Sequence, residues 1–129
     1  MKTVFNKIIP IKGFVALCLW PYIFVREQAA SKYTVVVNNH EHIHAEQQKE
    51  MLIVGLALAF AFYWSIGFWS LLFIPIFLWW YLIEWFIRLF CKGNAYMKIS
   101  FEREAYANKN DLAYLSSRKR FAWIKYLFN

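Results

Sequence analysis

The chain has 129 residues, of which 60% are hydrophobic and 22% are aromatic. This length provides for a single domain over residues 1–129, and so small a domain has too little interior to bury 13 Phe, 8 Tyr and 7 Trp side chains. The composition therefore argues against a water-soluble globular protein and for a membrane-associated one. The formal net charge of +7 comes from basic residues that flank an uncharged stretch, residues 51–83, so we expect anionic lipid headgroups as partners and no nucleic acid.

Residues 1–37 are predicted to be rich in β-structure. Three short runs, residues 13–17, 22–25 and 33–37, are enriched in β-branched or aromatic residues and are separated by proline or polar residues. The apolar stretch around them resembles a signal peptide, but Pro21 interrupts it and no small-residue cleavage pattern follows, so we expect it to remain in the mature protein.

Residues 38–64 are predicted to form one helix that begins in water and continues into the bilayer. Asn38 and Asn39 are favourable N-cap residues, and no strong helix breaker separates the polar first half from the apolar second half. About 20 helical residues cross the hydrocarbon core, and residues 51–90 provide roughly two such lengths. We therefore expect a hairpin, with residues 66–90 as the returning membrane helix.

Residues 100–129 are predicted to return to polar, helical structure. Ser100 is a candidate N-cap for a helix that runs to about Leu115, and a basic, aromatic-rich amphipathic helix is expected from Arg118 onward, in the headgroup layer. Glu84 and Arg88, four residues apart, are expected to pair on the returning helix. Cys18 and Cys91 are expected as buried thiols, with a disulfide as the alternative. Together these elements predict an α+β fold that is mainly helical.

The sequence His-Glu-His-Ile-His at residues 40–44 satisfies the metal-binding motif H-E-x-x-H. At about 100° per residue, four steps place His44 within about 40° of His40 and one turn further along the helix, so both imidazoles can bind one cation. Glu41 lies about 100° round the helix, within reach of a metal-bound water, which predicts a catalytic base. His42 points to the far side and is excluded as a ligand.

A catalytic zinc site needs a third protein ligand and an open fourth position. All three histidines of the chain lie in the motif, so the third ligand must be Asp, Glu or Cys, and residues 101–108 offer two glutamates. Gln47 lies on the metal-facing side and is expected to contact substrate or a neighbouring loop. A di-iron carboxylate site is the main rival, but it needs a second E-x-x-H, for which no histidine remains.

H-E-x-x-H followed downstream by E-x-x-A-[D/N] resembles the gluzincin clan of zinc metallopeptidases. The likeness is greatest to membrane heat-shock proteases, CAAX-prenyl proteases and small membrane-associated bacterial proteins of this type, and it covers residues 38–50 and 100–112. Matched by position, Glu104 would be the third zinc ligand, and Asn108, where the family usually has Asp, would orient a histidine. The alternative register makes Glu102 the ligand and places Tyr106 at the orienting position.

The resemblance implies hydrolysis of a peptide or protein substrate with Zn²⁺ as cofactor and Glu41 as general base. Tyr106, Tyr114 and Arg103 are the candidates for stabilising the oxyanion. Both motifs must lie on one side of the membrane, which requires an even number of crossings or a hairpin that dips in and returns. The basic flanks place the active site on the cytoplasmic side, and the resemblance implies a bacterial inner membrane. The alternative function is a catalytically inactive membrane adaptor or partner-binding protein with a metallopeptidase-like fold.

Overall fold

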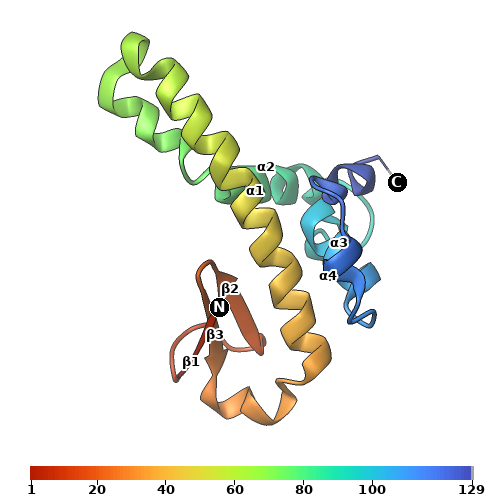
Figure 1. The fold of residues 1–129 in the computed structure, drawn as a ribbon. Coiled ribbons are helices and arrows are strands. Elements are labelled where there is room, and N and C mark those ends of the chain that lie inside the picture. Colours follow the sequence, from red (N-terminus) through yellow and green to blue (C-terminus); the bar gives the residue numbers. More distant parts are fainter. Residues whose placement is uncertain (129) are drawn as a thin grey trace.

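The computed structural model describes residues 1–128 and shows an α+β chain that is mainly helical, as the sequence predicts. A small sheet and a group of short C-terminal helices flank the first half of one long helix, whose second half projects away from them (Figure 1). The chain therefore has a mixed, packed end and a narrow, purely helical end.

The sheet has three strands in the order β1-β3-β2. Strand β3 pairs in parallel with β1 and antiparallel with β2. Cys18, Ile23 and Val25 are buried on the sheet and pack against Ala45 of the long helix, which fixes the position of β2 beside that helix. The strands are β1 (Lys2–Asn6), β2 (Ala16–Leu19) and β3 (Tyr22–Arg26).

The long helix α1 spans Val35–Ile66 and carries the histidine motif in its first half. Thr34 is its N-cap, because the Thr34 side chain accepts a hydrogen bond from the backbone N–H of Val37 at 3.3 Å. The predicted strand at residues 33–37 is therefore wrong, since the three valines form the first turn of the helix. The predicted start at Asn38 is three residues too late for the same reason.

Helix α1 ends at Gly67, whose φ of 58° and ψ of −137° let the chain reverse. The 3₁₀-helix η2 (Gly67–Phe73) then returns alongside α1 (Figure 1). Gly55 permits this close packing, because a Cβ atom there would lie 2.7 Å from the carbonyl oxygen of Ile74. By length and composition the helical run Val35–Phe73 is sufficient to cross a membrane, with a mean hydropathy of 2.0.

The predicted single returning helix over residues 66–90 is divided in two, because Pro75 separates η2 from helix α2 (Ile76–Leu89). The expected pair between Glu84 and Arg88 is confirmed, with a distance of 3.3 Å. The Glu84 carboxylate also accepts hydrogen bonds from the backbone N–H and the hydroxyl of Ser100, at 2.9 and 2.7 Å. Ser100 is thus the first residue of the next helix rather than its cap, and Glu84 supplies the capping carboxylate.

The C-terminal part is less helical than predicted. Helix α3 spans Ser100–Asn108 and ends well before Leu115, and the expected amphipathic helix is a short 3₁₀-turn. Met51 of α1, Ile99, Phe101 and Trp123 form a second core that packs α3 against α1. Both cysteines are free: Cys18 is buried as expected, whereas Cys91 is exposed. The remaining elements are η3 (Tyr96–Lys98), α4 (Tyr114–Ser117) and η4 (Ala122–Tyr126).

Candidate metal centre

Three buried side chains from two helices meet at one point beside α1. His40 and His44 lie one turn apart on α1, as their spacing predicts, and their Nε2 atoms are 3.0 Å apart. Glu102 reaches them from the first turn of α3, with one carboxylate oxygen 3.4 Å from Nε2 of His40 and the other 3.4 Å from Nε2 of His44. One ligand atom from each of the three residues lies within 4.8 Å of the others, so the group could hold a metal ion.

The expectation that Glu104 approaches the histidines is corrected, because the structure brings Glu102 there instead. Two residues along a helix correspond to a rotation of about 200°, so the two glutamates face opposite sides of α3. The Glu104 carboxylate contacts Arg118 at 2.6 and 3.1 Å and also accepts a hydrogen bond from the Tyr114 hydroxyl at 3.0 Å. Arg118 also binds Glu50 of α1 at 2.6 Å, so Glu104 belongs to a buried ion-pair network.

Gln47 connects this network to the histidines rather than contacting an open cleft. Its side-chain amide nitrogen donates to the backbone carbonyl of Phe101 and to Glu104, both at 3.0 Å. These two acceptors fix the orientation of the amide, so its oxygen must accept the hydrogen bond at 2.8 Å from Nδ1 of His44. His44 therefore carries a proton on Nδ1, and its Nε2 lies on the side of His40 and Glu102, where a cation would bind.

In the described part of the chain, one donor atom at this point lacks a hydrogen-bond partner, although Tyr81 donates to the other carboxylate oxygen of Glu102 at 2.9 Å. Within residues 1–128 one carboxylate oxygen of Glu102 is fully buried and accepts no hydrogen bond. Burial alone would raise the pKa of Glu102, but the nearby imidazoles of His44 and His40, when protonated, outweigh burial and hold that pKa below its ordinary value. An ionised carboxylate beside two imidazole nitrogens is a donor set that a divalent cation satisfies.

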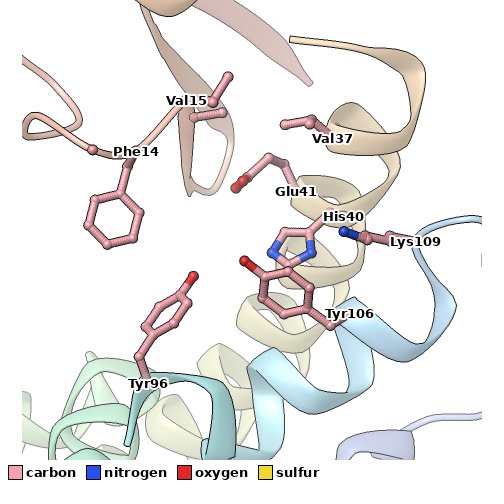
Figure 2. A pocket seen from close by; sticks show the side chains of 10 residues that line it. Phe14, Val15, Val37, His40, Glu41, Tyr96, Tyr106 and Lys109 are labelled. Atoms are coloured by element: carbon pink, nitrogen blue, oxygen red, sulfur yellow. The ribbon is translucent and has the colours of Figure 1, made fainter. Parts of the chain in front are cut away.

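Glu41 is buried next to the histidine pair and faces a pocket of about 180 Å³. Figure 2 shows its carboxylate, the ring of His40 and the hydroxyl groups of Tyr96 and Tyr106 directed into the same space. The position agrees with the helical spacing, which keeps Glu41 beside the metal-binding face without making it a ligand. A carboxylate so placed can exchange a proton with a molecule in the pocket.

Tyr106 and Tyr96 supply hydroxyl groups to this pocket. The Tyr106 ring lies edge-on against His40, with ring centroids 4.7 Å apart. Burial, and then the negative charge of Glu102, raises the pKa of both tyrosines, so both hydroxyls are protonated donors at neutral pH. Tyr96 was missed because it lies in the short 3₁₀-helix η3, outside both motifs, and nothing in its local sequence connects it to the histidines.

Three other predicted site residues lie away from the pocket. Asn108 donates to the backbone carbonyl of Glu104 at 2.7 Å and to the Tyr126 hydroxyl at 3.1 Å, and not to a histidine, because it lies on the side of α3 that carries Glu104. Arg103 donates to the backbone carbonyl of Tyr126 at 2.7 Å. Tyr114 is held by Glu104, so Tyr106 is the one predicted oxyanion residue that lines the pocket.

Asn39 performs a tethering role that the sequence did not indicate. Its amide nitrogen lies 2.9 to 3.4 Å from three carbonyl oxygens at the C-terminal end of α3, those of Asn108, Lys109 and Asp111. It was expected only to cap α1, yet it connects α1 to the helix that bears Glu102. Its position directly before His40 is the one signal in the sequence that could have identified it.

A larger cleft of about 580 Å³ adjoins the same residues. It runs between the loop before β2 and one side of α2, and it includes His40, His44, Glu41 and Glu102 at its polar end. The rest of its wall is almost entirely apolar. The main apolar contributors are Ile8, Ile9, Ile11, Leu17, Leu19, Phe77, Leu78, Leu82 and Trp85.

A scan against protein-family models, a search of curated proteins and a search of solved structures each found no match to this chain.

Proposed function

We propose that the chain is a zinc-dependent peptidase that works at the membrane surface, with His40, His44 and Glu102 as metal ligands. The observation that carries the proposal is the convergence of three buried donor atoms beside a fourth group, the Glu41 carboxylate, that faces an open cleft. Two imidazoles and one carboxylate are the protein ligands of one large class of catalytic zinc sites, in which the fourth position stays open for water or substrate.

A zinc ion held there would polarise a peptide carbonyl and make water a strong nucleophile at neutral pH. Glu41 takes the proton from the attacking water and later delivers it to the leaving amine. Tyr106 and Tyr96 donate hydrogen bonds to the oxygen that gains negative charge in the transition state. Gln47 keeps His44 in the tautomer that binds a cation.

The cleft favours a polypeptide with apolar side chains near the scissile bond. Its polar end carries the proposed catalytic groups, and its long wall is formed by apolar residues of α2 and the loop before β2. A cleft of this composition binds a chain mainly through burial of apolar surface, at roughly 25 cal/mol per Å².

The decisive experiment combines metal analysis with turnover on a library of apolar peptides, using protein purified in lipid nanodiscs. We expect wild-type protein to bind one equivalent of zinc and to cleave, His44→Ala to lose both properties, and Glu41→Gln to keep zinc and lose turnover. His42→Ala is the matched control, because His42 Nδ1 contacts the backbone carbonyl of Asn38 and not the cluster.

The same experiment discriminates against the inactive-adaptor alternative. An adaptor would show no turnover in the wild-type protein and would be indifferent to Glu41→Gln. Wild-type protein that binds no zinc would exclude the peptidase proposal.

A further inference from the structure

We propose that the chain enters only one leaflet of the bilayer: the hairpin of residues 51–75 dips into the hydrocarbon and returns to the side on which the metal centre lies. This topology does not depend on peptidase activity, and it decides between a spanning hairpin and one that dips in and returns, which the sequence leaves open. It rests on the length of the hairpin, on the surface of its two limbs and on the position of the basic residues.

The surface of the hairpin is too apolar to lie in water and is suited to the hydrocarbon of a bilayer. No charged residue occurs between residues 51 and 83. The side chains that project from both limbs are large and apolar, and a patch of this size does not occur on a protein that is surrounded by water. Those exposed include Ile53, Leu56, Phe60, Phe62, Trp64, Ile66, Phe68, Trp69, Leu71 and Leu72.

The run Val35–Phe73 is long enough to cross when it is counted as a whole, but it includes the polar turns that carry the histidines and the returning η2; the limbs of the hairpin alone are too short. Fifteen helical steps separate Met51 from Ile66, which gives an apolar limb of about 23 Å, whereas the hydrocarbon core is about 30 Å thick. Gly55 packs against the backbone of Phe73 and Ile74. The last residues of the returning limb therefore lie at the same height as Gly55 along α1. Beyond that contact the hairpin extends only about 17 Å, roughly half of the hydrocarbon thickness.

The tip of the hairpin also lacks the features of a loop in the opposite aqueous phase. The reversal at Gly67 occurs within helical structure, since the N–H of Gly67 donates to the carbonyl of Tyr63. Backbone groups satisfied in this way are tolerated inside hydrocarbon. Tryptophan side chains favour the interface between lipid and water. Trp64 and Trp69 would lie at the interface of the opposite leaflet if the hairpin crossed the bilayer, but limbs of this length do not reach that interface.

Basic and apolar residues alternate at the base of the hairpin, where the headgroups of the same leaflet would lie. The loop before β2 exposes Ile8 and Ile11, at 78% and 72%, between the exposed lysines Lys7 and Lys12. This pattern combines insertion into the interface with attraction to anionic lipid. Because Ile8, Ile11 and α2 also line the larger cleft, the mouth of that cleft opens onto the leaflet.

Site-directed labelling tests the topology in sealed proteoliposomes that contain anionic lipid. Cys91, which is exposed, is first replaced by serine, and Cys18 is retained because it is buried. One cysteine is then introduced at the tip, in Phe68→Cys, and one on the side of the metal centre, in Lys119→Cys, which is the matched control. A membrane-impermeant maleimide is added from either face.

We expect Lys119→Cys to react from one face only and Phe68→Cys to react from neither, although both react after solubilisation in denaturant. Labelling of Phe68→Cys from the face opposite to Lys119 would establish a spanning hairpin and overturn the proposal. Labelling from the same face would place the hairpin in water and overturn it equally. Trp64→Cys repeats the tip measurement if Phe68→Cys does not fold.

A spin label provides an independent measure of depth at the same positions. With a nitroxide at residue 68, we expect collisions with oxygen to exceed those with a water-soluble nickel chelate, and the excess to be larger than at residue 56 near the base of the hairpin. The opposite order would place the tip at an aqueous interface and contradict insertion into one leaflet.

Discussion

The side-chain oxygen of Gln47 accepts a hydrogen bond from Nδ1 of His44 across 2.8 Å, and this contact determines which nitrogen of His44 can bind a cation. Gln47 is fully buried, and its amide nitrogen is fixed by Phe101 and Glu104 of α3. The orientation of the imidazole therefore depends on the docking of α3 against α1.

Replacing Gln47 by leucine should weaken zinc binding by about 10- to 100-fold, because Nδ1 of His44 loses the acceptor that fixes its tautomer. Competition with a chromophoric chelator measures the affinity, and the d–d spectrum of Co²⁺-loaded protein reports the change at the metal. An unchanged Co²⁺ spectrum in Gln47→Leu would show that Gln47 only packs.

The two glutamates of α3 should respond in opposite ways. Glu102→Gln should abolish zinc binding and lower the stability of the metal-free protein only modestly, since the histidines that hold the Glu102 pKa low lose the negative charge that they face. Glu104→Gln should lower the free energy of unfolding by about 3 kcal/mol, because buried Arg118 loses one of its two carboxylate partners. Metal content and thermal unfolding of the metal-free variants check both outcomes, and the reverse pattern would identify Glu104 as the ligand.

Removing the Tyr106 hydroxyl should lower kcat by about 100-fold with little change in KM, if that hydroxyl stabilises charge only in the transition state. Tyr106→Phe keeps the ring contact with His40, so zinc binding should persist. Tyr22→Phe, at an exposed position on the sheet, is the control. A rise in KM at unchanged kcat would instead assign Tyr106 to substrate binding.

The two cysteines should differ sharply in reactivity. Burial, with a smaller contribution from the nearby Glu41 charge, raises the pKa of the Cys18 thiol to about 12, so it remains protonated and unreactive at pH 8. Cys91 is exposed. We expect a thiol reagent to modify one equivalent of cysteine in the folded protein, at Cys91, and two after denaturation. Rapid modification of Cys18 in the folded state would contradict the packing of β2 against α1.

Enlarging Gly55 should separate the two limbs of the hairpin. Any side chain there would contact the backbone of Phe73 and Ile74, which cannot move independently of η2. Gly55→Val should therefore destabilise the protein by about 1–3 kcal/mol, whereas Ala57→Val, at an exposed position on the same helix, should have little effect. Thermal unfolding followed by circular dichroism compares the two, and equal stability would argue against close limb packing.

The sequence by itself determined the features that depend on local spacing. The four-residue separation of His40 and His44 places them on one face of any helix, and the uncharged run of residues 51–83 provides a helix apolar enough to cross a membrane. The position of Glu41 beside the metal-binding face follows from the same geometry. These conclusions need no knowledge of what the helix packs against.

Only the tertiary structure decided which residues complete the site. Either Glu102 or Glu104 can be aligned with the glutamate of the E-x-x-A-[D/N] motif. Which of the two faces the histidines depends on the rotation of α3 about its axis. That rotation is set by remote contacts: Glu84 at the start of the helix, Phe101 in the core and Arg118 against Glu104. Because such contacts join residues far apart in the chain, no local pattern could predict that Glu104 would be neutralised by an arginine and Glu102 left facing the histidines.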